Sequence, residues 1–487
     1  MKLVFVLPPH EAGRLAKLKL LSGLKAGRWR HRTSSIAWHD TAELALAADG
    51  LSLAEREGDW RLQSLVPGEA FWPPGTPPPV LEQAASLEQI GRELPAGLHK
   101  VATFDGRMST LALQRDGAPL ALELLQGRVG WARRRRPACR LSLEGDEPAV
   151  LALARELTAE LAIQIPIASL AAEACAVAKA SAPPDRHEGP PRLRAGLTVA
   201  EAFTHALGHL TDVILTEAQR VLAGPEGLEP AHQLRVAVRR LRSTIAVFRP
   251  AIACPLVDST NLGLEALGDR VAPARDWDVF VAETCAQVEQ ALPDDTGLRR
   301  LHAGAERRRR EAYAALRSWL QGADFRQLGV ALAGLAGGEA WLIPVDAPQQ
   351  EARGLELETF GSQALRRRLR RLTEAGEAIE HLDAEALHAI RLRAKRMRYA
   401  AEVFAPVFPG RPARRFLRRL ANLQDCLGVL NDGTVADALL GELGADRGAR
   451  AHAAGLVRGF LAARAGQARG QIGRAWQRFR RLEPFWT

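Results

Sequence analysis

Residues 232–242 read His232-Gln-Leu-Arg235-Val-Ala-Val-Arg239-Arg240-Leu-Arg242, and the same pattern returns at residues 388–398. The second copy reads His388-Ala-Ile-Arg391-Leu-Arg-Ala-Lys395-Arg396-Met-Arg398. At the same distance from each histidine stands an aspartate, Asp276 after Arg275 and Asp432 after Asn431. The chain therefore contains an internal repeat that carries polar chemistry.

Helical periodicity gives each copy two different sides. With 3.6 residues per turn, the histidine and three cations fall on one side and apolar residues fall on the other. The cationic stripes are His232, Arg235, Arg239, Arg242 and His388, Arg391, Lys395, Arg398. The apolar stripes are Leu234, Val238, Leu241, Ile245 and Ile390, Ala394, Met397, Ala401. Each helix is expected to bury its apolar stripe and to present its cationic stripe.

The cationic stripes lack acidic neighbours. No Asp or Glu occurs between Ala231 and Val247, or between Ala389 and Ala401. Solvated helices usually mix charges, because like charges one turn apart repel each other. We therefore expect an anion to supply the counter-charge. A simply solvated basic face remains the alternative.

Composition limits the class of protein. The 487 residues hold 66 Lys and Arg against 56 Asp and Glu, a net charge of +10 that favours an acidic partner. The five cysteines form no C-x-x-C pair, so a reducing cytoplasm and no structural zinc are expected. No apolar run approaches the ~20 residues of a membrane helix, so we predict no membrane span.

The sequence changes character at residues 181–197, which we interpret as a Pro-rich linker. Residues 1–180 are expected to form an α+β domain, and residues 198–487 an all-α bundle of ten or more helices. The strand candidates are 3–7, 51–53, 111–113, 120–125 and 141–143, and the helix candidates are 10–22, 40–49 and 147–162.

Residues 198–487 resemble the CHAD domain. The resemblance rests on the two repeated stretches above, on Arg275-Asp-Trp-Asp-Val279, and on Leu427-Gly-Val-Leu-Asn-Asp432. It implies two pseudo-symmetric helical halves, about 198–345 and 346–487. It also implies binding of inorganic polyphosphate on a basic, histidine-containing surface between the halves, and association with polyphosphate granules.

Residues 1–180 resemble a degenerate CYTH domain, the triphosphate tunnel fold of adenylyl cyclases and thiamine triphosphatases. The matching segments are 38–53, 60–65 and 141–145. Four parts of the family's pattern are replaced in this chain. Lys2-Leu-Val-Phe-Val-Leu7 stands in place of the E-x-E-x-K strand, and Val66 stands in place of the lysine that contacts the substrate. Arg140-Leu-Ser-Leu143 replaces the L-E-L-E-L strand, and Ser169-Leu170 replaces the Ser-Lys pair. Since the missing carboxylates hold metals and the missing cations hold triphosphate, the resemblance implies a barrel-like domain without catalysis, metal or cofactor.

The predicted polyphosphate contacts extend beyond the two stripes. They are His232, Arg235, Arg239, Arg240, Arg242, His388, Arg391, Lys395, Arg396, Arg398, Arg415 and Arg419. Guanidinium groups bind phosphate oxygens in a bidentate manner, and lysine acts as a point charge. Arg415 and Arg419 are i,i+4 neighbours that would extend the row of phosphate-binding cations.

Alternative roles remain open for several of these residues. The histidines could instead cap or bridge helices, whereas a metal is disfavoured because Arg235 and Arg391 would repel it. Arg240 and Arg396 lie on the other flank, where pairing with acids of the bundle is the alternative. Asp276 and Asp432 are interpreted as structural acids or caps at turn-to-helix starts. The arginine runs 307–310 and 366–371 are typical of solvated helix faces, and Arg133 to Arg136 are typical of an exposed strand or turn.

Two rival functions follow from the same sequence. One is residual triphosphatase or other phosphohydrolase activity of residues 1–180, which the lost acidic strand disfavours. The other is binding of a nucleic-acid backbone, which also presents repeating phosphates. Nucleic acid is the less expected partner, because aromatic residues make up only 5% of the chain and none lies among the stripe residues as a stacking platform.

Overall fold

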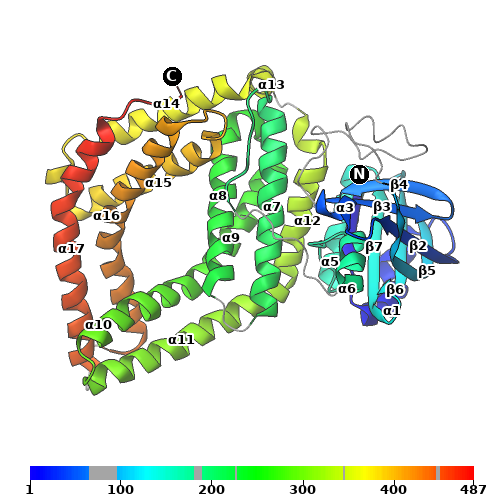
Figure 1. Ribbon diagram of the computed structural model, residues 1–487, viewed down its shortest axis with the longest axis horizontal. Helices are drawn as coiled ribbons and strands as arrows, with labels where there is room; N and C mark the ends of the chain where they lie inside the picture. The colour runs from blue at the N-terminus through cyan, green and yellow to red at the C-terminus, as the bar shows by residue number, and fades with distance from the viewer. Residues whose placement is uncertain (65–95, 180–188, 225–227, 344–345, 446–449, 487) are drawn as a thin grey trace.

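The computed structural model of the protein describes residues 1–64, 96–179, 189–224, 228–343, 346–445 and 450–486. Figure 1 shows an N-terminal domain built on one sheet beside a larger helical region. Among these described residues, no helix is long and apolar enough to cross a membrane. Residues 189–197 hold neither helix nor strand, while 181–188 lie outside the described part, so the boundaries of the linker stay a prediction.

The N-terminal domain is a curled, half-barrel sheet of seven antiparallel strands. Their order across the sheet is β1-β7-β6-β5-β2-β3-β4. The strands are β1 (Lys2–Val6), β2 (Arg30–Asp40), β3 (Leu51–Arg56), β4 (Asp59–Ser64), β5 (His99–Arg115), β6 (Ala118–Trp131) and β7 (Arg134–Gly145). All five strand candidates from the sequence lie within or overlap β1, β3, β5, β6 and β7. The CYTH-like segment 60–65 lies in β4 except Leu65, which is outside the described residues, as is Val66.

The predicted helix at 40–49 is wrong in part. Strand β2 continues to Asp40, and only α3 (Ala45–Ala48) is helical. The buried Asp40 carboxylate explains the difference, because it accepts hydrogen bonds from the backbone N–H groups of Thr41, Leu46 and Ala47. These bonds end the strand and hold the short helix against it.

Alternating side chains give the sheet two apolar faces. One face, with Leu111, Leu122 and Leu141, packs against α5 (Glu147–Glu160). The predicted helix at 10–22 is divided into three short elements, η1 (Pro9–Glu11), α1 (Ala12–Leu15) and α2 (Lys19–Leu24). The opposite face, with Phe104 and Val129, packs against α6 (Leu170–Lys179). Both faces of the sheet are therefore covered by helices.

The helical region contains eleven α-helices in its described part, in agreement with the expected ten or more. They are α7 (Val199–Ala223), α8 (Leu228–Ile252), α9 (Pro255–Val279), α10 (Ala286–Ala291), α11 (Thr296–Gln321), α12 (Ala323–Gly337), α13 (Ala347–Gly354), α14 (Leu357–Ala375), α15 (Ala384–Phe404), α16 (Arg411–Glu442) and α17 (Arg450–Arg480). In Figure 1 most of their ribbons frame an open centre, with α8 and α9 on one side and α16 and α17 on the other, while α7 and α12 lie toward the sheet domain.

The two sequence repeats are the helices α8 and α15. Their apolar stripes are buried as predicted, from Leu234 and Leu241 in α8 to Ile390 and Met397 in α15. The two helices share one core, in which the rings of Phe248 and Phe404 have centroids 5.8 Å apart. Because the apolar stripes pack into this core, the cationic stripes lie on the opposite side of each helix.

Helix α12 joins the helical region to the sheet domain. Its Val330 is fully buried in the apolar cluster of the sheet and α5. Arg326 donates a hydrogen bond to the carbonyl oxygen of Thr158 at 2.9 Å, and Glu147 accepts one from the backbone of Glu339 at 2.8 Å. The two parts of the chain therefore pack directly against each other.

Candidate anion-binding site

The cationic stripes of the two repeats meet at one pocket of about 320 Å³, which we name the first pocket. Helix α8 contributes His232, Arg235 and Arg239, and helix α15 contributes Arg391 and Lys395. The expected meeting of the two stripes on one basic surface is thus present for these five residues.

The first pocket carries an excess of positive charge. Its cations are Arg235, Arg239, Arg275, Arg391, Lys395 and Arg464, and its acids are Asp276, Glu283 and Asp432. With His232 neutral, six cations face three carboxylates. Arg275 from α9 and Arg464 from α17 were not selected from the sequence. The pocket therefore favours an anion, although part of its charge is already balanced.

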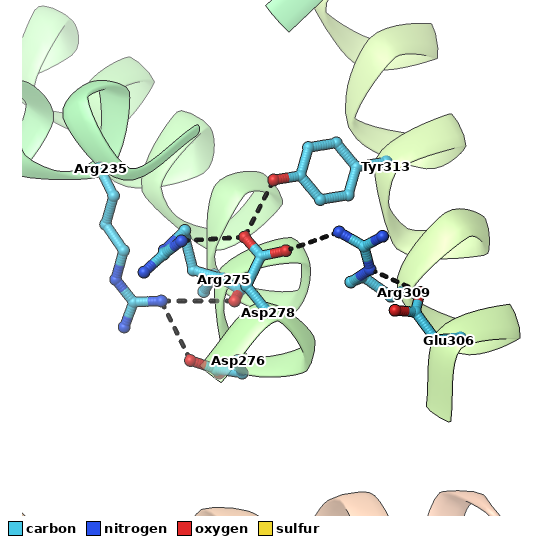
Figure 2. Close-up of polar contacts among 8 residues, drawn as sticks. Arg235, Arg275, Asp276, Asp278, Glu306, Arg309 and Tyr313 are labelled. Atoms are coloured by element: carbon cyan, nitrogen blue, oxygen red, sulfur yellow. Dashed lines mark hydrogen bonds and ion pairs between the residues drawn. The ribbon is translucent and has the colours of Figure 1, made fainter. Parts of the chain in front are cut away.

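Asp276 balances part of that charge by holding Arg235. The Arg235 guanidinium donates to Asp276 Oδ1 at 3.1 Å and to the carbonyl oxygen of Ala272 at 3.3 Å (Figure 2). The prediction that Asp276 and Asp432 stand at turn-to-helix starts is wrong, since they lie inside α9 and α16. Pairing with a cation of the neighbouring helix, rather than capping, accounts for Asp276. Its predicted role as a structural acid is confirmed.

A buried carboxylate behind the pocket fixes Arg275. Asp278 is 1% exposed and accepts hydrogen bonds from Arg275 at 3.0 Å and from the Tyr313 hydroxyl at 2.9 Å (Figure 2). Burial raises the pKa of Asp278, while the bond from Tyr313 and the charge of Arg275 act in the opposite direction. Arg309 pairs with the same carboxylate at 3.5 Å. The prediction of a solvated 307–310 run is therefore wrong for Arg309, which turns inward to this acid.

Two guanidinium groups of the first pocket have unpartnered atoms. The Nε atoms of Arg239 and Arg391, one from each repeat, are buried and have no hydrogen-bond partner among the described residues. Burial is the main cause that lowers the pKa of both side chains. A buried donor without a partner is costly, so an anion that accepted these bonds would offset the cost.

Lys395 and His232 are two groups of the first pocket whose protonation the neighbouring cations disfavour. Burial, followed by the charges of Arg391 and Arg239, lowers the pKa of Lys395 to about 8. Burial and the charge of Arg275 lower the pKa of His232 as well. Both groups would gain charge beside a bound anion. Among the residues described here, no group of three or more His, Cys, Asp or Glu is placed to hold a metal ion.

A second pocket of about 320 Å³, named the second pocket below, has Arg239 in common with the first. Its other cations are Arg242 of α8, Arg396 of α15 and Arg368 of α14. Arg368 is half-buried and donates to the carbonyl oxygen of Ala246 at 3.3 Å. The prediction of a solvated 366–371 run is wrong for this residue, because its side chain reaches across to α8.

The other predicted contacts are placed elsewhere. Arg240 lies 3.6 Å from Glu402, and Arg398 donates to Glu402 at 2.7 Å and to Gln424 at 3.1 Å. For Arg240 the alternative of an acidic partner within the bundle therefore holds. His388, Arg415 and Arg419 are not among the described residues that line either pocket.

The residues that replace the CYTH pattern make their contacts within the sheet domain. Lys2 pairs with Glu144 at 3.2 Å, and the Ser169 hydroxyl accepts a bond from the backbone N–H of Ala172. The buried Arg140 pairs with Glu173 of α6, which also pairs with Arg136 at 3.4 Å. The cation in β7 is thus held by a carboxylate of the chain itself.

The fold and pockets define a helical double-repeat domain with a shared basic site. Residues 205–441 match the model of the CHAD domain, and this part of the chain is a CHAD domain. The CHAD domain from the plant Ricinus communis is similar in structure, with a TM-score of 0.52 and 27% identity over 62% of this chain and 98% of that chain. PptA from Streptomyces chartreusis has a TM-score of 0.44 and 18% identity over 58% of this chain and 100% of that chain. No curated protein matches the chain. The CHAD family is linked to polyphosphate binding.

Proposed function

We propose that this protein binds inorganic polyphosphate in the first pocket. The observation that supports this most is the pair of buried, unpartnered Nε atoms of Arg239 and Arg391. One arginine comes from each repeat, and both line the same pocket. An anion between the repeats would accept a bond from both at once.

The chemistry of the pocket suits a condensed phosphate. Such a chain repeats its negative charge at every phosphate, and arginine side chains grip phosphate oxygens through paired N–H donors. Partial burial strengthens each contact, because the local dielectric is lower than that of water. The three carboxylates of the pocket repel anions, so a single weakly charged anion is expected to bind poorly.

We also propose that the protein binds polyphosphate without hydrolysing phosphate esters or anhydrides. The sheet domain supports this, because Arg140 is held by Glu173 and the metal-binding carboxylates of the CYTH pattern are replaced. The test is phosphate release from ATP, thiamine triphosphate and tripolyphosphate with Mg²⁺ or Mn²⁺. We expect background release, and turnover abolished by a chelator would contradict the proposal.

A protein that binds a storage polymer is expected to gather where that polymer gathers. We therefore propose a cytoplasmic protein located at polyphosphate granules. A fluorescently tagged chain should co-localise with granules, and it should become diffuse in cells that cannot make polyphosphate. Granule localisation that persisted without polyphosphate would contradict this proposal.

The binding proposal is tested by titrating the full chain with long-chain polyphosphate at several salt concentrations, with DNA and RNA as competitors. We expect low-micromolar or tighter affinity that falls steeply as salt rises, because binding releases counterions from the polyanion. Equal affinity for orthophosphate, or no dependence on salt, would contradict the proposal. Displacement of polyphosphate by DNA or RNA at equal phosphate concentration would favour the nucleic-acid alternative.

A further inference from the structure

The two pockets are joined at one side chain. Arg239 lines both, and its guanidinium carbon lies 5.6 Å from the ring centroid of Tyr399, which lines the second pocket. An elongated ligand that contacts Arg239 in the first pocket is therefore next to the second pocket.

The second pocket differs from the first in its charge. Its described lining includes Arg239, Arg242, Arg368 and Arg396 but no Asp or Glu, whereas the first pocket contains three carboxylates. Arg242 pairs at 2.9 Å with Glu265, which is not part of the lining. A larger fraction of the cations in the second pocket than in the first is therefore not balanced by a carboxylate.

Arg368 carries much of that uncompensated charge. Its described contacts are two backbone carbonyl oxygens, those of Ala364 at 3.4 Å and Ala246 at 3.3 Å. Burial, followed by the charges of Arg367, Arg371 and Arg396, lowers the pKa of Arg368 to about 10. Burying a cation without a carboxylate partner is unfavourable, and a phosphate group would offset this cost.

We infer that the second pocket is a phosphate-binding subsite continuous with the first, so that the protein selects condensed phosphate chains long enough to occupy both. This inference rests on the proposed function of the first pocket. A chain that is already held in one pocket reaches the other at a high effective concentration, so occupying both raises affinity beyond that of either alone. A short oligophosphate held in the first pocket gains nothing from Arg368.

The experiment compares two ligands and two variants of the full chain. Long-chain polyphosphate and tripolyphosphate are titrated into wild type, Arg368→Gln and Arg367→Gln. Arg367 is the matched control, because it loses the same charge from the same helix but is exposed and lines neither pocket. We expect Arg368→Gln to weaken long-chain binding about tenfold or more and to leave tripolyphosphate binding close to that of the control.

Three outcomes would overturn the inference or its basis. Equal long-chain affinity of Arg368→Gln and Arg367→Gln, or an equal loss for both ligands, would overturn the subsite and leave the proposed function standing. Absence of polyphosphate binding by wild type would overturn the proposed function itself. If Arg368→Gln does not fold, Arg396→Gln removes an exposed cation of the same pocket, and we expect the same loss for the long chain only.

Discussion

Arg239 of the first repeat lies over the ring of Tyr399 of the second repeat, with its guanidinium carbon 5.6 Å from the ring centroid. This cation–π contact crosses from α8 to α15 at the border of the two pockets. It holds the guanidinium without neutralising it, whereas Arg235 is held by the carboxylate of Asp276. The contact between repeats therefore leaves Arg239 charged and available to an anion.

Glu402 of α15 links the two repeats through its ion pair with Arg240 of α8, and it also pairs with Arg398 of its own helix. We expect Glu402→Gln to lower the free energy of unfolding by about 1–3 kcal/mol, because two cations near a poorly exposed position lose their counter-charge. The share of Arg398 is reduced by solvent screening, since its side chain is 38% exposed. Urea unfolding measures the change.

Glu374→Gln is the matched control for Glu402. Glu374 forms an exposed pair with Arg370 on the surface of α14. We expect its removal to change the free energy of unfolding by less than about 0.5 kcal/mol. Equal stability of the two variants would show that Glu402 does not join the repeats.

Asp278→Ala should be more destabilising, with a loss of about 2–4 kcal/mol in the free energy of unfolding. The change leaves Arg275 and Arg309 partly buried without their shared carboxylate. Polyphosphate affinity should fall as well, because Arg275 lines the first pocket and loses its anchor. Asp437→Ala removes an exposed partner of Arg458 and should change neither quantity appreciably. Equal unfolding midpoints for the two variants would contradict this account.

Polyphosphate binding should depend on pH through Lys395. In the free protein this ammonium loses its proton as the pH rises through about 8. A bound anion favours the ammonium, so the complex keeps the proton to higher pH, and binding takes up a proton. Affinity should therefore be highest below about pH 8 and fall above it. Isothermal titration in buffers of different ionisation enthalpy measures the proton uptake.

Lys395→Arg is the control for this pH dependence. Arginine stays protonated throughout this pH range, so the variant should bind polyphosphate with little change between about pH 7 and pH 9.5. The charged groups that face Lys395, namely Arg235, Arg239, Arg391 and Asp432, are kept in this variant. The same pH dependence in wild type and Lys395→Arg would assign the titration to another group.

The sequence predicted what depends on local periodicity. The buried stripes of α8 and α15 follow from the 3.6-residue period, and their meeting follows from the repeat. The strands with continuous apolar runs were found, whereas β2 was missed because its first half, from Arg30 to Ser35, is polar. Patterns of this kind are visible without knowledge of tertiary contacts.

Which arginines reach the pockets could not be predicted in the same way. Helices α14 and α17 carry arginines on several faces, and only packing decides that Arg368 and Arg464 point toward α8 and α15. The repeat is also imperfect in its chemistry. Thr434 stands in the second copy where Asp278 stands in the first, and His388 is exposed where His232 lines the pocket. Equivalent positions of the two copies therefore have different roles.

The most direct test of the central claim is the affinity of long-chain polyphosphate for Arg391→Gln and Arg393→Gln. Both changes remove one arginine from α15, but Arg391 lines the first pocket with an unpartnered Nε, whereas Arg393 is exposed and lines neither pocket. We predict a loss of about tenfold or more for Arg391→Gln, with unchanged or higher stability, and a loss of less than about threefold for Arg393→Gln. Equal affinities in two folded variants would contradict binding between the repeats.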